Sequence, residues 1–412
     1  MERRTFLGLA AGAGLSSLLM SCDSRATGSA GSKLRIAIIG GGIVGASIAM
    51  FCARAGANVT LLEKAAPAAG ATSKSFAWIN AFHDDETYTG LRLEAIKHWQ
   101  QLDKPLGMNV IWGGYVAFTD KPEDKGRFAT QDKGLTKYGF PFEHLDMAAL
   151  KQRAPEIDPG HLVEGLYSPS GGHVDPVHAT NRFLAAATSA GAKILYPRLV
   201  SAIDPATNGS EGVTLITADG REKFDHVIVA AGVDVPALLA PIGYKAPLLY
   251  RPGALVHSKR MPIITKHVYD GPTLLEWRQA ADGSFVGLDS SGPPKIPVHE
   301  AGILDHPMEF PPGIDQMHGE RILSKLAKYV PAIKNAEYDH MTLGLRPYPV
   351  DDRPIFGQIP GVPGVSVCVT HSGMTLAALL GAYMANEVVG GKTEALMAPY
   401  RPARAFKQPP PA

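Results

Sequence analysis

The segment from residue 34 to residue 64, LRIAIIGGGIVGASIAMFCARAGANVTLLEK, constrains the fold more than any other part of this sequence. Its first six residues include one charged side chain in an otherwise apolar run, as expected for a parallel strand covered on both faces. Helical periodicity then continues to about residue 55, and residues 58–62 predict a second strand. The segment therefore predicts a strand, a glycine turn, a helix and a parallel strand.

The turn contains three glycines with the spacing G-x-G-x-x-G. Gly40 allows the tight turn, Gly42 lets a pyrophosphate approach the backbone, and Gly45 lets helix and strand pack closely. Glu63, followed by Lys64, ends the second strand, where a carboxylate can accept hydrogen bonds from both ribose hydroxyls and would repel a 2′-phosphate. The pattern predicts a site for NAD or FAD rather than NADP. The alternative is a glycine-rich turn that binds no nucleotide.

Composition excludes several other classes of function. The 412 residues suffice for two or three domains, and 45% hydrophobic residues predict a sizeable core. A formal net charge of +1 gives no electrostatic reason to expect nucleic acid as a partner. The three cysteines and fourteen histidines show no metal-ligand spacing, so we expect no metal site. Catalysis would then need an organic cofactor or side chains alone.

The first 32 residues predict a signal peptide and linker. R-R-T-F-L at residues 3–7 resembles a twin-arginine export signal, and the apolar run over 6–20 is too short to span a bilayer. L-M-S-C, ending at Cys22, is similar to a lipoprotein cleavage box, so a lipid anchor and plain cleavage near Ala30 both remain open. The alternative is an N-terminal amphipathic or core helix. The signal predicts export by the twin-arginine machinery to the periplasm or cell envelope.

Four later segments, taken in their order along the chain, identify a family. Together with the glycine turn they resemble the D-amino-acid oxidase superfamily of FAD-dependent amine oxidoreductases, which includes glycine oxidase, sarcosine oxidase and the D-amino-acid dehydrogenases. The resemblance runs from about Arg35 to Gly391. The segments are GATSKSFAWINA (70–81), GGHVDPVHATNRFLAAATSAGAKILY (171–196), GVTLITADGREKFDHVIVAAG (212–232) and GVSVCVTHSGMTLAALLGAYMANEVVGG (364–391).

The resemblance assigns roles to residues near the expected flavin. It places Thr72 and Ser73 on a small-residue loop against the cofactor phosphates and the flavin ring. It places Trp78 and Asn80 beside the ring, although a tryptophan there could equally belong to the core. His371 precedes a turn that faces the flavin, and could be catalytic or a structural histidine.

Further along the chain, the resemblance assigns roles at the two ends of the cofactor. It implies that the backbone near Val200 touches adenine and that the A-A-G sequence ending at Gly232 closes over the nucleotide. It also implies that the helix beginning near Gly373, with the N–H groups of Met374 and Thr375, points at the N1/C2=O edge of the flavin, where reduction places negative charge.

The stretch GLRPYPVDDRPIFG, residues 344–357, resembles a glycine oxidase pattern whose arginine grips the substrate carboxylate, which implies that role for Arg346. A residue before proline is pushed to an extended conformation, and a planar guanidinium can hold a carboxylate with two parallel bonds. Alternatively, Arg346 pairs with Asp351 or Asp352 and ties a hairpin. Lys295 lies roughly where sarcosine oxidase has a lysine that assists oxygen, although a solvated loop lysine is the simpler interpretation.

The predicted fold class is α/β, α+β overall: a Rossmann-like FAD-binding domain with a second, mainly antiparallel-sheet substrate domain. The FAD-binding domain is predicted to be discontinuous, and the proline-rich end of the chain to be a disordered tail. The predicted ranges are 33–81, 171–241 and 346–400 for the FAD-binding domain, 82–170 and 242–345 for the substrate domain, and 401–412 for the tail.

The predicted function is oxidation of the Cα–N bond of a small D-amino acid, glycine or sarcosine by hydride transfer to flavin N5. This reaction gives an imino acid, then a keto acid and ammonia, with oxygen or a membrane quinone as electron acceptor. Sarcosine oxidase attaches its flavin to a cysteine, whereas residues 344–346 here are Gly, Leu and Arg, so we expect non-covalent FAD. The alternatives are a 2-hydroxy-acid dehydrogenase of the same fold and a non-catalytic flavin-binding envelope protein.

Overall fold

The computed structural model describes residues 33–205, 212–290, 310 and 313–406. The predicted signal segment with Cys22 and the loop with Lys295 lie outside the described residues. Every helix and strand described here belongs to the compact unit that begins at Leu34. No helix in the described ranges is both long enough and apolar enough to cross a membrane.

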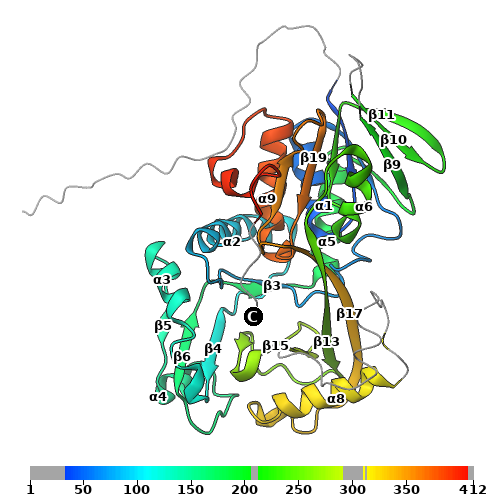
Figure 1. Ribbon diagram of the computed structural model, residues 1–412. Helices are drawn as coiled ribbons and strands as arrows, with labels where there is room; N and C mark the ends of the chain where they lie inside the picture. The colour runs from blue at the N-terminus through cyan, green and yellow to red at the C-terminus, as the bar shows by residue number, and fades with distance from the viewer. Residues whose placement is uncertain (1–32, 206–211, 291–309, 311–312, 407–412) are drawn as a thin grey trace, which may run out of the picture. The chain divides into compact units, whose positions relative to one another are not determined.

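A six-stranded sheet contains the predicted dinucleotide motif (Figure 1). Its strand order is β18-β19-β12-β1-β2-β8, and all neighbouring pairs are parallel except β18 and β19. The strands are β1 (Arg35–Ile39), β2 (Asn58–Leu62), β8 (Lys193–Leu195), β12 (His226–Val229), β18 (Ile355–Gln358) and β19 (Val365–Val369). The two parallel strands predicted from the glycine-rich segment are confirmed.

Both faces of this sheet are covered, which explains the apolar run in β1. Ile36 and Ile38 face a core formed mainly by four long helices, whereas Ala37 and Ile39 face a second core on the opposite side. The helices of the first core are α1 (Ile43–Arg54), α2 (Glu86–Leu106), α5 (Pro176–Ser189) and α9 (Gly373–Val388). The second core is covered by β9 (Val200–Pro205), β10 (Val213–Thr217), β11 (Gly220–Phe224) and α6 (Val235–Leu239).

An eight-stranded mixed sheet forms the other half of the unit. Its order is β17-β13-β16-β15-β14-β4-β6-β5, antiparallel except for the β14–β4 pair. The strands are β4 (Tyr115–Thr119), β5 (Glu143–His144), β6 (Glu164–Ser168), β13 (Leu248–Ser258), β14 (Val268–Asp270), β15 (Leu275–Gln279), β16 (Phe285–Asp289) and β17 (Tyr338–Pro349). This sheet agrees with the predicted antiparallel sheet.

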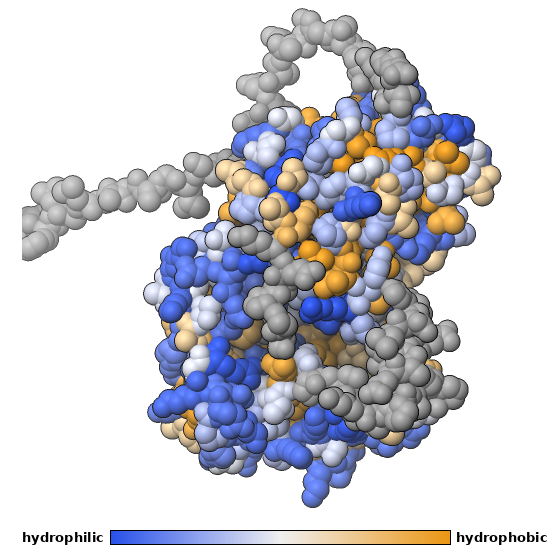
Figure 2. All heavy atoms as spheres, viewed as in Figure 1, coloured by the Kyte–Doolittle hydropathy of each residue, from blue (hydrophilic) through white to orange (hydrophobic). Residues whose placement is uncertain are grey.

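Smaller elements complete the eight-stranded half. Helices α3 (Ala129–Lys137), α4 (Met147–Arg153) and α8 (Ile314–Leu326) also belong to this half. Strands β3 (Trp78–Ile79) and β7 (Gly172–His173) form a separate antiparallel pair, and β3 lies above β4 and β15 in Figure 1. The surface over α3 and α4 is mainly hydrophilic in Figure 2.

The long strands β13 and β17 pair along their length, from Leu248 opposite Pro349 to Ser258 opposite Tyr338. They lie side by side and run from the neighbourhood of the six-stranded sheet into the eight-stranded one (Figure 1). β17 therefore crosses the domain boundary predicted at residues 345/346, and α2, predicted in the substrate domain, packs in the core with α9. The predicted domain ranges stay a prediction.

The prediction of a disordered tail from residue 401 is wrong for residues 401–406. Arg404 donates from Nε and Nη2 to the two carboxylate oxygens of Asp351, at 2.8 and 2.9 Å, and both side chains are nearly buried. Arg401 pairs in the same way with Glu387. These two ion pairs hold a segment whose proline content alone predicted disorder. Residues 407–412 lie outside the described residues.

We expect Arg404→Ala to lower the free energy of unfolding by ~3 to 5 kcal/mol, because it leaves the nearly buried Asp351 carboxylate without its main partner. Urea denaturation of the purified protein measures this change. Arg221→Ala is the matched control, since it breaks an exposed Arg–Asp pair with Asp204 and should cost at most ~1 kcal/mol. Equal losses in the two variants would contradict the structural role of Arg404.

Candidate active site

A cavity of about 1070 Å³ brings most of the predicted site residues together. Only two of the predicted residues, Gly45 and Ser73, are absent from its wall. The predicted residues that line it are Gly40, Gly42, Glu63, Lys64, Thr72, Trp78, Asn80, Val200, Gly232, Arg346, His371, Gly373, Met374 and Thr375. Residues from segments far apart in the sequence thus converge on one space, as the predicted cofactor and substrate sites require.

The turn between β1 and α1 leaves no room for side chains. A Cβ at Gly45 would lie 2.0 Å from the carbonyl oxygen of Gly40, so α1 can approach β1 only with glycine here. Gly40 has a φ of +111°, and a Cβ there would lie 2.5 Å from the carbonyl oxygen of Ala230. Gly42 caps α1 without a side-chain hydrogen bond, and the first residues of the helix, Ile43 and Val44, line the cavity with it. This geometry fits a bound pyrophosphate.

The end of β2 and the loop after it complete the wall near this turn. Glu63 accepts hydrogen bonds from the backbone N–H groups of Gly41, at 2.7 Å, and Ala65, at 2.8 Å. Lys64 pairs with Asp234 at 2.5 Å. Thr72 accepts from the N–H of Ile43 at 3.2 Å, which brings its hydroxyl to the start of α1.

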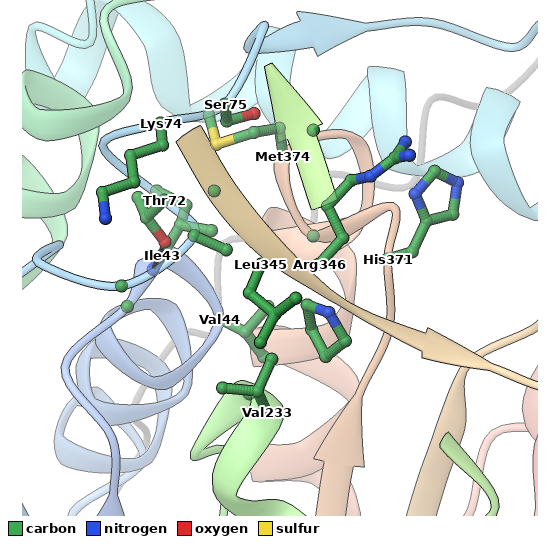
Figure 3. Close-up of a pocket in the computed structure, with 18 of the residues that line it drawn as sticks. Ile43, Val44, Thr72, Lys74, Ser75, Val233, Leu345, Arg346, His371 and Met374 are labelled. Atoms are coloured by element: carbon green, nitrogen blue, oxygen red, sulfur yellow. Dashed lines mark hydrogen bonds between the residues drawn. The ribbon is translucent and has the colours of Figure 1, made fainter. Parts of the chain in front are cut away.

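Ser73 is the exception on this loop. Its hydroxyl donates to the carbonyl of Gly70 at 3.5 Å, and its neighbours Lys74 and Ser75 line the cavity instead (Figure 3). The sequence pattern predicted the loop, but a turn within the loop decides which side chains face inward.

A buried cation, Arg92, lies against the start of α9. Arg92, on α2, donates to the Ser372 hydroxyl at 2.9 Å and to the backbone oxygen and side chain of Asn80. Trp99 donates to the carbonyls of Met374 and Thr375 at 3.0 Å. The N-terminal dipole of α9 and the Arg92 charge therefore reinforce each other at the cavity wall. Together they favour negative charge beside them.

Arg346 extends from β17 into the cavity, where its side chain is exposed. Its Nε and Nη2 lie 3.4 Å from the carbonyls of Arg251 and Pro252, which places the guanidinium over β13. Within the described ranges it forms no ion pair: Asp351 is held by Arg404, and Asp352 contacts histidines. Partial desolvation by the protein around the cavity lowers the pKa of Arg346. The hairpin-tie interpretation is therefore wrong, and the cation faces the cavity.

His371 lies beside Arg346 (Figure 3) and is linked to a second histidine through Asp352. Its Nε2 is 3.6 Å from one carboxylate oxygen of Asp352, while His83 is hydrogen-bonded to the other at 3.3 Å. The His371 ring stacks on Tyr348 with 4.5 Å between centroids. Burial lowers the pKa of His371 to about 3, against the opposing effect of Asp352. The imidazole is therefore neutral at physiological pH and adds no positive charge beside Arg346.

Trp78 packs in an aromatic cluster and also lines the cavity. Its ring packs in a cluster with Phe76, Phe82 and Tyr115, with centroids 5.7 to 6.4 Å away, and it also lines the cavity. Its backbone carbonyl accepts a hydrogen bond from the Thr375 hydroxyl at 3.1 Å. Its position therefore fits both interpretations of the sequence, a tryptophan beside the flavin ring and a tryptophan in the core.

Sequence reasoning missed several charged residues in the cavity wall, among them Arg92 and Glu276. These two each left a signal. Arg92 lies on the stripe of α2 that also carries Tyr88, Ile96 and Trp99, all buried, at helical spacing. Glu276 alternates with the buried Leu275 and Trp277 on β15, so it lies on the opposite face of the strand.

The family comparison decides the class of protein. A family model described as FAD dependent oxidoreductase (DAO) matches residues 35–387. This chain belongs to that family. Its cofactor is therefore FAD, and the glycine turn and the donor-rich start of α9 fit a dinucleotide with a redox ring.

Curated relatives extend the comparison. Mitochondrial dimethylglycine dehydrogenase of Rattus norvegicus is 25% identical over 86% of this chain, but this chain spans only 43% of its length. An opine oxidase polypeptide of Rhizobium meliloti is 25% identical over 88% of this chain and 95% of its own length. Glycine oxidase from Geobacillus kaustophilus has a solved structure with a TM-score of 0.78 and 22% identity, covering 91% of this chain and all of that one. The last comparison confirms the mixed α/β fold class.

We expect Gly45→Ala to abolish FAD retention, because the added methyl group must push α1 away from β1. The ratio of flavin to protein absorbance in the purified variant measures this loss. Gly70→Ala is the control on the same cavity, since a Cβ there meets nothing within 4 Å. Normal flavin content in Gly45→Ala would show that the close helix–strand contact is dispensable.

The neutral state of His371 also predicts a pH dependence of stability. An unfolded histidine binds a proton below its ordinary pKa of 6.5, whereas folded His371 does so only near its pKa of about 3. Its contribution to stability is present above pH 6.5 and is lost as the pH falls towards 3. His371→Gln should therefore lose less stability than the wild type between pH 7.5 and 5 in urea denaturation. The exposed-residue control His144→Gln should follow the wild type.

Proposed function

We propose that this protein is an exported FAD-dependent oxidoreductase that oxidises the Cα–N bond of a small amino acid of the D-amino acid, glycine or sarcosine type. One observation carries the proposal. The Arg346 guanidinium faces the cavity with no ion-pair partner among the described residues, beside a histidine that stays neutral. A cation without an ion-pair partner is what a substrate carboxylate requires, and a neutral histidine beside it does not repel a substrate amine.

Arg346 would bind the substrate carboxylate. Hydrogen bonds to a charged group contribute about 1.5 to 3 kcal/mol each, and a guanidinium can form two in parallel. The pairing of β13 with β17 fixes the backbone of Arg346. Its Nε and Nη2 donate hydrogen bonds to two backbone carbonyls of β13, which fixes the direction of the guanidinium. The carboxylate would therefore be fixed in direction as well as in place, which orients the Cα–H bond.

His371 would stay neutral beside the substrate and would not act as the base, because a pKa of about 3 makes it too weak to deprotonate an ammonium group. Its lowered pKa keeps the ring unprotonated even with Asp352 nearby, so His371 adds no positive charge that would repel the substrate amine. The substrate amine would lose its proton to solvent and be oxidised in its neutral form. Bound FAD would supply the two-electron acceptor for the hydride leaving Cα. The imino acid product would then add water and release ammonia, leaving a keto acid.

The relatives support this substrate class. The names of two of them refer to glycine and to dimethylglycine, each of which carries an amine and a carboxylate on one carbon. The paired arginines at residues 3 and 4 support export to the periplasm or cell envelope, with or without a lipid at Cys22. Oxygen or a membrane quinone would then reoxidise the flavin.

Non-covalent FAD belongs to the same proposal. The two cysteines in the described ranges, Cys52 and Cys368, are buried, and burial raises the pKa of both thiols, which leaves them poorly suited to attack a flavin. Flavin that is released on acid precipitation would agree with this.

We expect Arg346→Ala to lower kcat/KM for flavin reduction by an amino acid by ~10²- to 10⁴-fold, the loss of two charge-assisted hydrogen bonds. Arg346→Lys should fall between, because an ammonium keeps the charge but not the two-pronged geometry. Anaerobic stopped-flow absorbance of the flavin measures both. Arg251→Ala removes a neighbouring guanidinium that does not line the cavity, and its effect should be much smaller.

The same assay distinguishes the alternatives. A rate unchanged by Arg346→Ala would remove the carboxylate role from the proposal. Bleaching by 2-hydroxyglutarate, with no bleaching by D-alanine, glycine or sarcosine, would favour a 2-hydroxy-acid dehydrogenase. A flavin that neither class of compound reduces would indicate a binding protein without turnover.

A further inference from the structure

A carboxyl group lies on the same wall of the cavity as Arg346, across the sheet on β15. Glu276 is on this strand, where the buried Leu275 and Trp277 on either side of it face the core that includes α8. Glu276 therefore faces the other way, like Arg278, which donates to the carbonyl of Phe76 at 2.6 Å. Gly344, on the Arg346 face of β17, is close-packed against Lys74. Both charged residues thus face the loop of residues 74–76.

Strand pairing gives the separation between these charges. Arg346 pairs with Arg251 on β13, and Glu276 pairs with Leu288 on β16. A Cβ at Gly253 would lie 3.2 Å from Nε of Arg346, so the guanidinium lies over that glycine. Two strand spacings of ~4.8 Å and two residues of ~3.4 Å then separate it, in projection, from the Cα of Glu276 by roughly 12 Å. The glutamate side chain covers part of this distance.

The wall between them is apolar where β13 and β16 form it, whereas Lys74 packs against Gly344 on the β17 side. The paired Gly253 and Gly344 have no side chains, and Leu255 and Leu288 line the cavity beyond them. A ligand with its carboxylate at Arg346 could extend an unbranched chain along this wall and reach Glu276 with its far end.

The Glu276 carboxyl has no hydrogen-bond or ion-pair partner among the side chains of the described residues. Its cross-strand neighbour is another acid, Asp270, which is already bound by Arg127. Burial, followed by the charge of Asp270, raises the pKa of Glu276 to about 8. An acid placed beside another acid, and without a cation of its own, is destabilised in its charged form until a ligand provides the cation.

We propose that Glu276 is a specificity-determining residue that binds the cationic end of a basic amino acid whose carboxylate is held by Arg346. The inference rests on the proposed function, and it narrows the substrate from small amino acids to those with an ammonium group at the end of an unbranched side chain. Lysine and ornithine have this chemistry, and norleucine is the neutral counterpart of lysine.

Binding can be tested without turnover. Perturbation of the flavin absorbance measures the affinity of 6-aminohexanoate, which has a carboxylate and a distal ammonium but no α-amine, against hexanoate. The wild-type holoprotein should bind 6-aminohexanoate more tightly, and Glu276→Gln should reduce this preference by ~10- to 100-fold, the value of a hydrogen bond to a charged group. Glu337→Gln, which changes an exposed carboxylate, should keep the wild-type preference.

Turnover provides the second measurement. Anaerobic flavin reduction by both enantiomers of lysine, ornithine, norleucine and glutamate gives the ratio of kcat/KM for basic and neutral substrates. Glu276→Gln should lower the lysine-to-norleucine ratio by the same ~10- to 100-fold, and Glu276→Asp should restore part of it. Reduction by norleucine or glutamate in preference to lysine, or an unchanged ratio in Glu276→Gln, would overturn this inference alone. Failure of every amino acid to reduce the flavin would overturn the proposed function with it.

Discussion

The pairing of β13 with β17 is the interaction on which the candidate site depends. The two strands are hydrogen-bonded from Leu248 opposite Pro349 to Ser258 opposite Tyr338, and they join the region of the dinucleotide motif to the substrate sheet. Arg346 occupies an interior position of this ladder, so its Cα cannot move without breaking pairs on both sides. The same ladder continues through β16 to β15 and thereby sets where Glu276 lies relative to Arg346. Substrate geometry is therefore a property of strand register.

Local features of the chain were predictable from sequence because their causes are local. The β1–α1–β2 unit follows from an apolar run, three glycines and helical periodicity within a single short segment, and the structure reproduces each element. The packing role predicted for Gly45 appears as the 2.0 Å clash that any side chain would suffer. The extended conformation expected for a residue before proline agrees with the strand containing Arg346. In each case the physical cause lies within a few residues of the feature.

Which side chains meet in the cavity was harder to predict, because it depends on register between distant segments. Arg92 reaches Asn80 and Ser372 only after α2 packs on α9, although the helical stripe marks it as inward-facing. Ser73 turns away while its neighbours face inward, a difference set by one turn. The tail shows the limit of composition: proline content predicted disorder, yet a bidentate pair between Arg404 and Asp351 fixes the segment. The composition of a segment is an average over its residues, whereas an ion pair depends on two particular residues that can lie far apart in the sequence.

The environment of the cavity lowers the pKa of His371 and raises the pKa of Glu276. Arg92, Arg346 and the start of α9 make one part of the wall electropositive, and this field adds to burial in keeping His371 neutral. On β15, burial and the neighbouring Asp270 both disfavour the ionised form of Glu276, and the positive charge of Arg346 only partly compensates. The protein thus stabilises an anion at one end of the wall and leaves an acid in need of a cation at the other. A zwitterionic ligand lying between them would relieve both imbalances, so the same electrostatics that perturb these groups also orient what binds.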